Sequence, residues 1–113
     1  MQTSRGRHKK YRIVKSEPKI AQFSPRGRPG RPDEIEITVD EFEAIRLRDF
    51  MGIKQKEAAK SMRISQPTFS RILKGARKAL ASGIIGGKRM KIQGGHYVLS
   101  SREDDQKKVL RSE

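Results

Sequence analysis

KQKEAAKSMRISQPTFSRILK, residues 54–74, is the stretch that decides the fold of this chain. Its first half carries two adjacent alanines, Ala58 and Ala59, whose small side chains allow another helix to cross closely. Its second half places Phe69 and Ile72 three residues apart, on one face of a helix. The residues between the two halves are too few for anything but a tight turn. The stretch therefore predicts two helices that pack against each other at a steep angle.

Local signals mark the ends of these two helices. Ser65 is a favourable N-cap residue, and Pro67 falls in the first helical turn, where its missing amide costs nothing. Gly83 and the glycines that follow it weaken a helix. We therefore expect a first helix over residues 54–61 and a second over residues 66–82.

A further helix is expected before this stretch. Thr38 and Glu41 have the spacing of a capping box, in which each residue bonds the other's backbone amide. Gly52 is expected to end the helix in a turn. Its buried face is predicted to consist of Val39, Phe42, Ala44, Ile45, Leu47 and Phe50.

The rest of the chain predicts short strands and irregular segments. Residues 11–14 suit a short strand, and residues 89–99 alternate around Gln-Gly-Gly as in a short β-hairpin. The organisation expected along the chain is a basic N-terminal tail and proline/arginine arm over 1–32, a helical domain over 33–88, the hairpin over 89–99 and a flexible polar C-terminal tail over 100–113.

Charge is distributed in blocks. The chain has 113 residues, enough for one core, and a net charge of +14, which attracts polyanions such as nucleic acid. Residues 33–53 form an acidic block between two basic ones. Two interpretations of this acidic block stay open: a helix that faces away from bound phosphates, or an ordinary solvated surface. The overall basic charge could also serve solubility alone.

Several function classes lack the residues that they need. The sequence has no cysteine, and its only histidines, His8 and His96, are far apart in the chain. It also has no apolar run of membrane-spanning length and no signal-peptide pattern. We therefore expect a cytoplasmic protein that is not an enzyme, carries no cofactor or metal and does not bind membranes.

The outward side of the predicted second helix has the chemistry of a DNA-reading surface. Residues in the first turns of such a helix reach base edges, and basic or hydroxyl residues around them reach phosphates. The residues expected to read bases are Gln66, Pro67, Ser70 and Arg71, and those expected to contact phosphates are Lys54, Gln55, Thr68, Lys74, Arg77 and Lys78. The alternative is a generic three-helix bundle with this apolar spacing by accident.

Residues 9–97 resemble a family of uncharacterised archaeal and bacterial predicted DNA-binding proteins. The resemblance rests on EP at 17–18, FSP at 23–25, TVDEFEAIRL at 38–47, QKEAA at 55–59, SQPTFSRIL at 65–73 and IQGG at 92–95. It implies a mainly α fold with a three-helix, helix-turn-helix core similar to region four of bacterial sigma factors, short β elements and a flexible basic arm. It also implies transcription-factor-like DNA binding, with the reading helix beginning at Gln66.

The chain departs from that family in two respects. The family's turn usually has glycine where this chain has Arg63, so a left-handed conformation there would cost on the order of 1 kcal/mol relative to glycine. Family members also often carry cysteines, which this chain lacks, so no metal or redox role transfers from them.

The arm holds a weaker signal. Arg26, Gly27, Arg28 and Arg31 lie among prolines in a pattern similar to an AT-hook, in which an extended Arg-Gly-Arg occupies a narrow minor groove. The alternative, which we favour, is a basic proline loop whose arginines only touch phosphate.

These observations favour a sequence-specific regulator of transcription that binds double-stranded DNA at the nucleoid. A homodimer would suit a palindromic site. One rival is a basic RNA-binding or ribosome-associated protein, whose signature would be exposed aromatic residues. The other is a module that contacts transcription machinery through its acidic helix.

Overall fold

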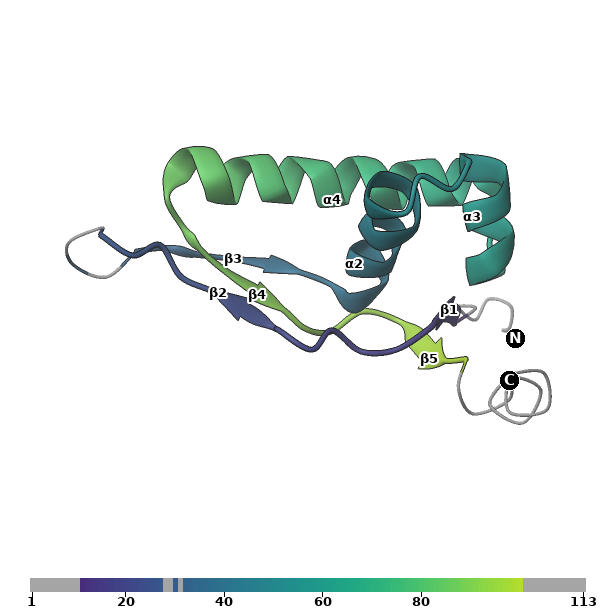
Figure 1. The fold of residues 1–113 in the computed structure, drawn as a ribbon, viewed down its shortest axis with the longest axis horizontal. Helices are drawn as coiled ribbons and strands as arrows, with labels where there is room; N and C mark the ends of the chain where they lie inside the picture. The colour runs from purple at the N-terminus through teal and green to yellow at the C-terminus, as the bar shows by residue number, and fades with distance from the viewer. Residues whose placement is uncertain (1–10, 28–29, 31, 101–113) are drawn as a thin grey trace, which may run out of the picture.

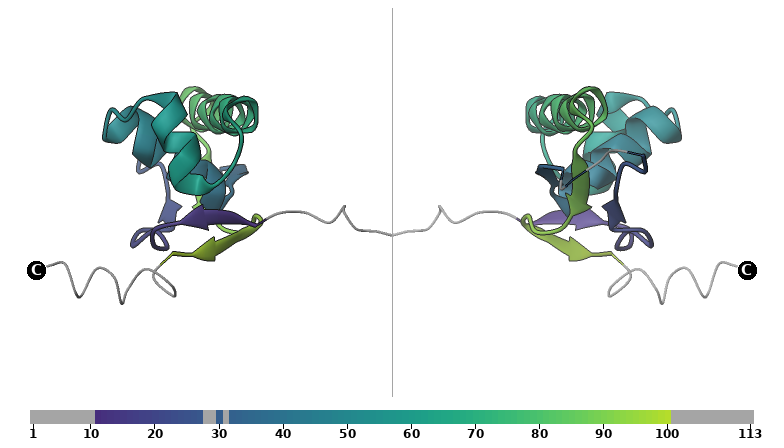
Figure 2. Two further views of the ribbon diagram at one scale, coloured as in Figure 1. Left: turned by 90° about the vertical axis from the view of Figure 1, so that its right-hand side faces the viewer. Right: turned by 90° about the vertical axis from the view of Figure 1, so that its left-hand side faces the viewer.

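The computed structural model describes residues 11–27, 30 and 32–100. Its elements in chain order are β1 (Arg12–Val14), β2 (Gln22–Phe23), β3 (Glu34–Ile37), α2 (Val39–Ile45), a π-helical turn η1 (Arg46–Phe50), α3 (Gln55–Met62), α4 (Gln66–Gly86), β4 (Arg89–Ile92) and β5 (Tyr97–Leu99). The helices lie on one side of the molecule and the strands on the other (Figures 1 and 2). The predicted combination of three helices with a few short strands is confirmed for the described residues.

The N-terminus of α2 is fixed by its own side chains. Thr38 Oγ1 accepts a hydrogen bond from the amide of Glu41 at 3.3 Å, and the Glu41 carboxylate accepts one from the amide of Thr38 at 2.9 Å. This reciprocal pair is the predicted capping box.

The prediction that Phe50 is buried is wrong, because its side chain is 84% exposed. The physical reason is η1, in which the amide of Met51 bonds the carbonyl of Arg46, five residues back, at 2.9 Å. A π-helical turn takes more residues than an α-helical turn, so Phe50 falls behind the α-helical periodicity and turns outward. Of the other predicted core residues, Val39, Ala44 and Leu47 are buried, and Phe42 and Ile45 are partly buried.

A turn of three residues, 63–65, joins α3 to α4, and α3 runs steeply across the first part of α4 (Figure 1). Arg63 adopts the left-handed conformation, with φ 57° and ψ 46°. The amide of Ile64 bonds the carbonyl of Ala59 at 3.0 Å and closes the end of α3. Ser65 then caps α4 by accepting from the amide of Thr68 at 3.2 Å, as predicted.

Helix α4 runs to Gly86, about one turn beyond the predicted end at residue 82. Gly83 is buried, and a Cβ built on it would lie 2.6 Å from Met90 Sδ. The missing side chain therefore lets α4 pack closely on β4, and this packing outweighs the low helix propensity of glycine. The helix ends at Gly87, which is left-handed with φ 61°.

The apolar interior has two parts on either side of α2. The first holds α3 and α4 together and consists of Ala44, Leu47, Ala58, Ala59, Met62, Phe69 and Leu73. The second joins the helices to the strands and consists of Val14, Ile37, Val39 and Ile92. Helix α2 contributes to both, so it fixes the α3–α4 pair relative to the sheets.

The strands form two small sheets, and the predicted hairpin over 89–99 is wrong. Strand β4 lies between β2, which is antiparallel to it, and β3, which is parallel, whereas β5 pairs in parallel with β1. The Gly94 carbonyl accepts a bond from the amide of Val39 at 3.0 Å, and Gly94 and Gly95 have positive φ angles. This anchor to α2 carries the chain away from β4 toward β1, and no hairpin forms.

None of the helices in residues 11–27, 30 and 32–100 has the length and apolar character needed to cross a bilayer.

Candidate nucleic-acid interface

The first two turns of α4 present the predicted base-reading residues to solvent. Phe69, which is fully buried, pins this end of the helix against the core. The opposite side of the same turns carries Gln66, Pro67, Ser70 and Arg71, all of which are exposed. Their predicted outward orientation is confirmed, while their roles toward bases stay predictions.

A hydroxyl network orders this end of the helix. Ser65 Oγ donates to Thr68 Oγ1 at 2.9 Å, and Arg71 Nη2 donates to the same oxygen at 3.3 Å. Thr68 itself is only partly exposed. The network therefore holds the Arg71 side chain along the first turns of α4.

Exposed cations continue along α4 and at the start of α3. Lys74 and Lys78 lie three and seven residues after Arg71, so the three share one exposed face of the helix. Lys54 is the exposed N-cap residue of α3, and Gln55 behind it is partly buried. Since α4 contains no acidic residue, its whole exposed surface is neutral or positive.

Arg77, the remaining predicted phosphate contact, is tied to another element. Its Nε and Nη2 donate to the two carboxylate oxygens of Asp49 in η1, at 3.1 and 2.6 Å. This mutual hydrogen bonding lowers the pKa of Asp49 and raises the pKa of Arg77. Sequence reasoning missed Asp49, because no local pattern links residues 28 positions apart.

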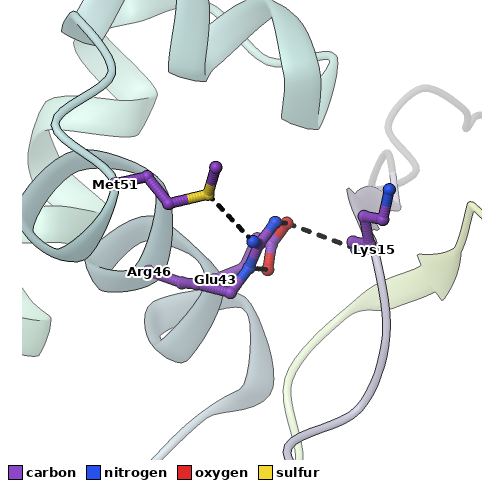
Figure 3. A network of polar contacts seen from close by, with 4 residues as sticks. All are labelled: Lys15, Glu43, Arg46 and Met51. Atoms are coloured by element: carbon purple, nitrogen blue, oxygen red, sulfur yellow. Dashed lines mark hydrogen bonds and ion pairs between the residues drawn. The ribbon is translucent and has the colours of Figure 1, made fainter.

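A buried carboxylate, Glu43, which is 1% exposed, ties α2 to η1 and to the residue after β1. Arg46 donates two hydrogen bonds to it, at 2.8 and 2.9 Å, and the amide of Lys15, the residue after β1, donates a third at 3.2 Å. Figure 3 shows these residues together. The hydrogen bonds to Glu43 raise the pKa of Arg46. Arg46 Nη1 also contacts Met51 Sδ at 3.1 Å, which links the first residue of η1 to the residue that caps its end.

Neither expected role of the acidic block holds for its two buried members. Asp40 and Glu43 are packed inside, so they form neither a solvated surface nor a face directed away from a ligand. The reason is that β1 and η1 supply cations: Arg12 Nη1 lies 3.1 Å from Asp40 Oδ2, and Arg46 pairs with Glu43. A carboxylate can be buried where such a partner meets it.

The arginine arm is described only in part. Arg26 and Gly27 are exposed, and Gly27 has a φ of 78°. Arg28 and Arg31 lie outside the described residues, as do the basic tail over 1–10 and the polar tail over 101–113.

Metal-ligating side chains do not gather anywhere in the described ranges, where no three His, Asp or Glu residues are placed to hold an ion. His96 lies at the β5 end with its ring centroid 6.0 Å from that of Tyr11.

Comparison with known proteins places the chain in one family. A family model described as "Protein of unknown function DUF134" matches residues 1–100. A UPF0251 protein of Thermoanaerobacter pseudethanolicus is 45% identical over 89 residues, which cover 78% of this chain and 75% of that protein. UPF0251 proteins of Methanothermobacter thermautotrophicus and Dehalococcoides mccartyi are 45% and 38% identical, covering 85% and 92% of this chain and 50% and 90% of those proteins.

No solved structure matches the chain. The match over residues 1–100 and the identity to these bacterial and archaeal relatives show that the chain belongs to the DUF134 family, whose relatives carry the name UPF0251.

Proposed function

We propose that this protein binds double-stranded DNA as a helix-turn-helix regulator of transcription, with the start of α4 in the major groove. The observation that carries the proposal is the pairing of a buried Phe69 with exposed Gln66, Ser70 and Arg71 in the same turns. A helix held in this way presents polar side chains without flexible loops, and these residue types bond adenine and guanine edges.

Electrostatics support the same orientation. The N-terminus of α4 carries the positive end of the helix dipole, and no acidic residue lies in its first turn. Lys74 and Lys78 extend the positive surface along α4, and Lys54 adds a charge at the start of α3. A DNA backbone passing these positions would meet cations from two helices. Such binding would put the protein at the nucleoid.

The direct test is selection of bound sequences from a random duplex pool, followed by fluorescence anisotropy on the selected site and on an unrelated duplex. We expect a preferred sequence, and a symmetric consensus would indicate that two copies bind together. Recovery of no preferred sequence would contradict sequence-specific regulation.

Two variants separate base reading from phosphate contact. Arg71→Ala should lose about 1–3 kcal/mol of binding free energy on the selected site and little on the unrelated duplex. Lys74→Ala should weaken both alike and lower the slope of log K against log salt by about 0.9. Lys19→Ala, which removes an exposed charge from the connection between β1 and β2, is the matched control and should leave the slope nearly unchanged.

RNA binding is the second candidate, and Phe50 is the observation that favours it. An aromatic side chain with 84% of its surface exposed beside a basic helix can stack on an unpaired base. Competition between the selected duplex and structured RNA at one salt concentration decides between the two candidates. If Phe50→Ala weakens RNA binding and RNA displaces the duplex, the DNA proposal is wrong.

A further inference from the structure

We propose that Asp49 is a positioning residue for DNA binding: it orients Arg77 so that the remaining donors of the guanidinium contact a backbone phosphate. The inference rests on the proposed function. It adds that an acidic residue, Asp49, increases the affinity for DNA although DNA is itself negatively charged. Removal of an acid near DNA ordinarily strengthens binding, so this proposal predicts the opposite sign.

The geometry of the pair leaves part of the guanidinium free. Asp49 occupies Nε and one hydrogen of Nη2, at 3.1 and 2.6 Å, which is the side-on bidentate arrangement. The second hydrogen of Nη2 and one hydrogen of Nη1 point away from the carboxylate, side by side along the outer edge of the same plane. That edge can bond two oxygens of one phosphate.

The pair lies on the surface and not in the core. The side chains of Arg77 and Asp49 are 51% and 38% exposed. Ion pairs with this exposure stabilise a fold little, so folding stability is a weak reason for the arrangement. The pair instead joins η1 to α4 and removes the rotamer freedom of a long side chain before any ligand arrives.

The surroundings indicate which ligand the free edge would meet. Arg77 follows Lys74 by three residues and precedes Lys78 directly, so its guanidinium borders the basic face of α4. Asp49 neutralises the local charge, which weakens long-range attraction. Once a phosphate is in contact, however, an oriented charge-assisted bond forms without the loss of side-chain entropy. Whether an Asp49 substitution raises or lowers the affinity for DNA shows which of these two effects is larger.

The test is a double-mutant cycle on the full chain with the selected duplex. Asp49→Asn should weaken binding about three- to tenfold, because Arg77 loses its orientation. In an Arg77→Ala background, the same change should leave binding unchanged or tighten it, because only repulsion is removed. Asp49→Glu keeps a carboxylate and should restore part of the affinity.

Glu57→Gln is the matched control, since it removes one exposed acid from the first turn of α3. It should leave binding unchanged or tighten it. Circular dichroism melting of each variant separates loss of positioning from loss of folding. If the role of Asp49 were only structural, its substitution would lower the melting temperature and weaken DNA binding in both backgrounds alike.

Tighter binding by Asp49→Asn in the wild-type background would overturn this inference while leaving the proposed function intact. Equal weakening in both backgrounds would also overturn it. A wild-type chain that binds no duplex would overturn both proposals.

Discussion

Replacement of Arg63 by glycine should make the protein more stable. Among the described residues, Arg63 is the one non-glycine residue with a positive φ, at 57°. The left-handed conformation costs a residue with a Cβ about 1–2 kcal/mol. Glycine removes that cost but has more freedom in the unfolded chain, which offsets about 0.5–1 kcal/mol. The two ranges subtract to between about 0 and 1.5 kcal/mol, and their middle values give a net gain in the free energy of unfolding of about 0.5–1 kcal/mol.

The assay is chemical and thermal unfolding of three variants. For a domain of this size, the gain corresponds to a rise in melting temperature of about 2–8 °C. Arg63→Ala is the essential comparison, because it loses the same side-chain atoms beyond Cβ but keeps the backbone cost. Ser61→Gly, inside α3, is the second control and should lower stability by about 0.5 kcal/mol, because serine already has a lower helix propensity than alanine. If Arg63→Gly is no more stable than Arg63→Ala, the assigned backbone strain is wrong.

Other predictions concern the contacts between α2 and the strands. Gly95→Ala should lower the free energy of unfolding by about 2–3 kcal/mol, because φ is 101° and a Cβ would collide with Asp40 and Thr38 at the start of α2. Gly27→Ala is the control: its φ is 78° but the surrounding space is open, so it should cost only about 1 kcal/mol. Glu43→Ala should lower the free energy of unfolding in urea by about 3 kcal/mol, because the guanidinium of Arg46 and the amide of Lys15 lose a buried acceptor. A loss below about 1 kcal/mol would contradict this reasoning. The hydrogen bond to Glu17 raises the pKa of Tyr97 above its ordinary value of 10.0, so this bond stabilises the fold below about pH 10 and its contribution is lost as pH rises through the raised pKa. The measurement is an absorbance titration at alkaline pH in a Tyr11→Phe variant, so that only Tyr97 contributes. The midpoint of the Tyr97 titration should fall when Glu17→Gln is combined with Tyr11→Phe.

Features encoded by neighbouring residues were predictable from the sequence. The capping box at Thr38 and the cap at Ser65 each depend on contacts within a few residues. The alternation of Phe69 with exposed polar residues likewise follows from helical periodicity alone. These signals located the α3–α4 pair and the outward surface of α4.

Features that depend on distant residues were not predictable. The predicted hairpin over residues 89–99 was wrong because the contact of Gly94 with α2 decides the strand pairing. The predicted burial of Phe50 was wrong because a π-helical turn leaves no clear pattern in the sequence. The burial of Glu43 depends on an arginine in the next turn and an amide from β1. Apolar and charged patterns alone do not contain such pairings.

The strand arrangement also constrains when the chain can fold during synthesis. The last strands, β4 and β5, provide the partners for β2, β3 and β1, and the register joins Arg12 to Tyr97 near opposite ends of the described chain. While a ribosome is still translating the segment after α4, the three early strands have no neighbours to bond. The helices can form locally, but both sheets must wait for the final strands to leave the exit tunnel. A messenger truncated after α4 should therefore yield a chain with three unpaired strands, open to aggregation or proteolysis.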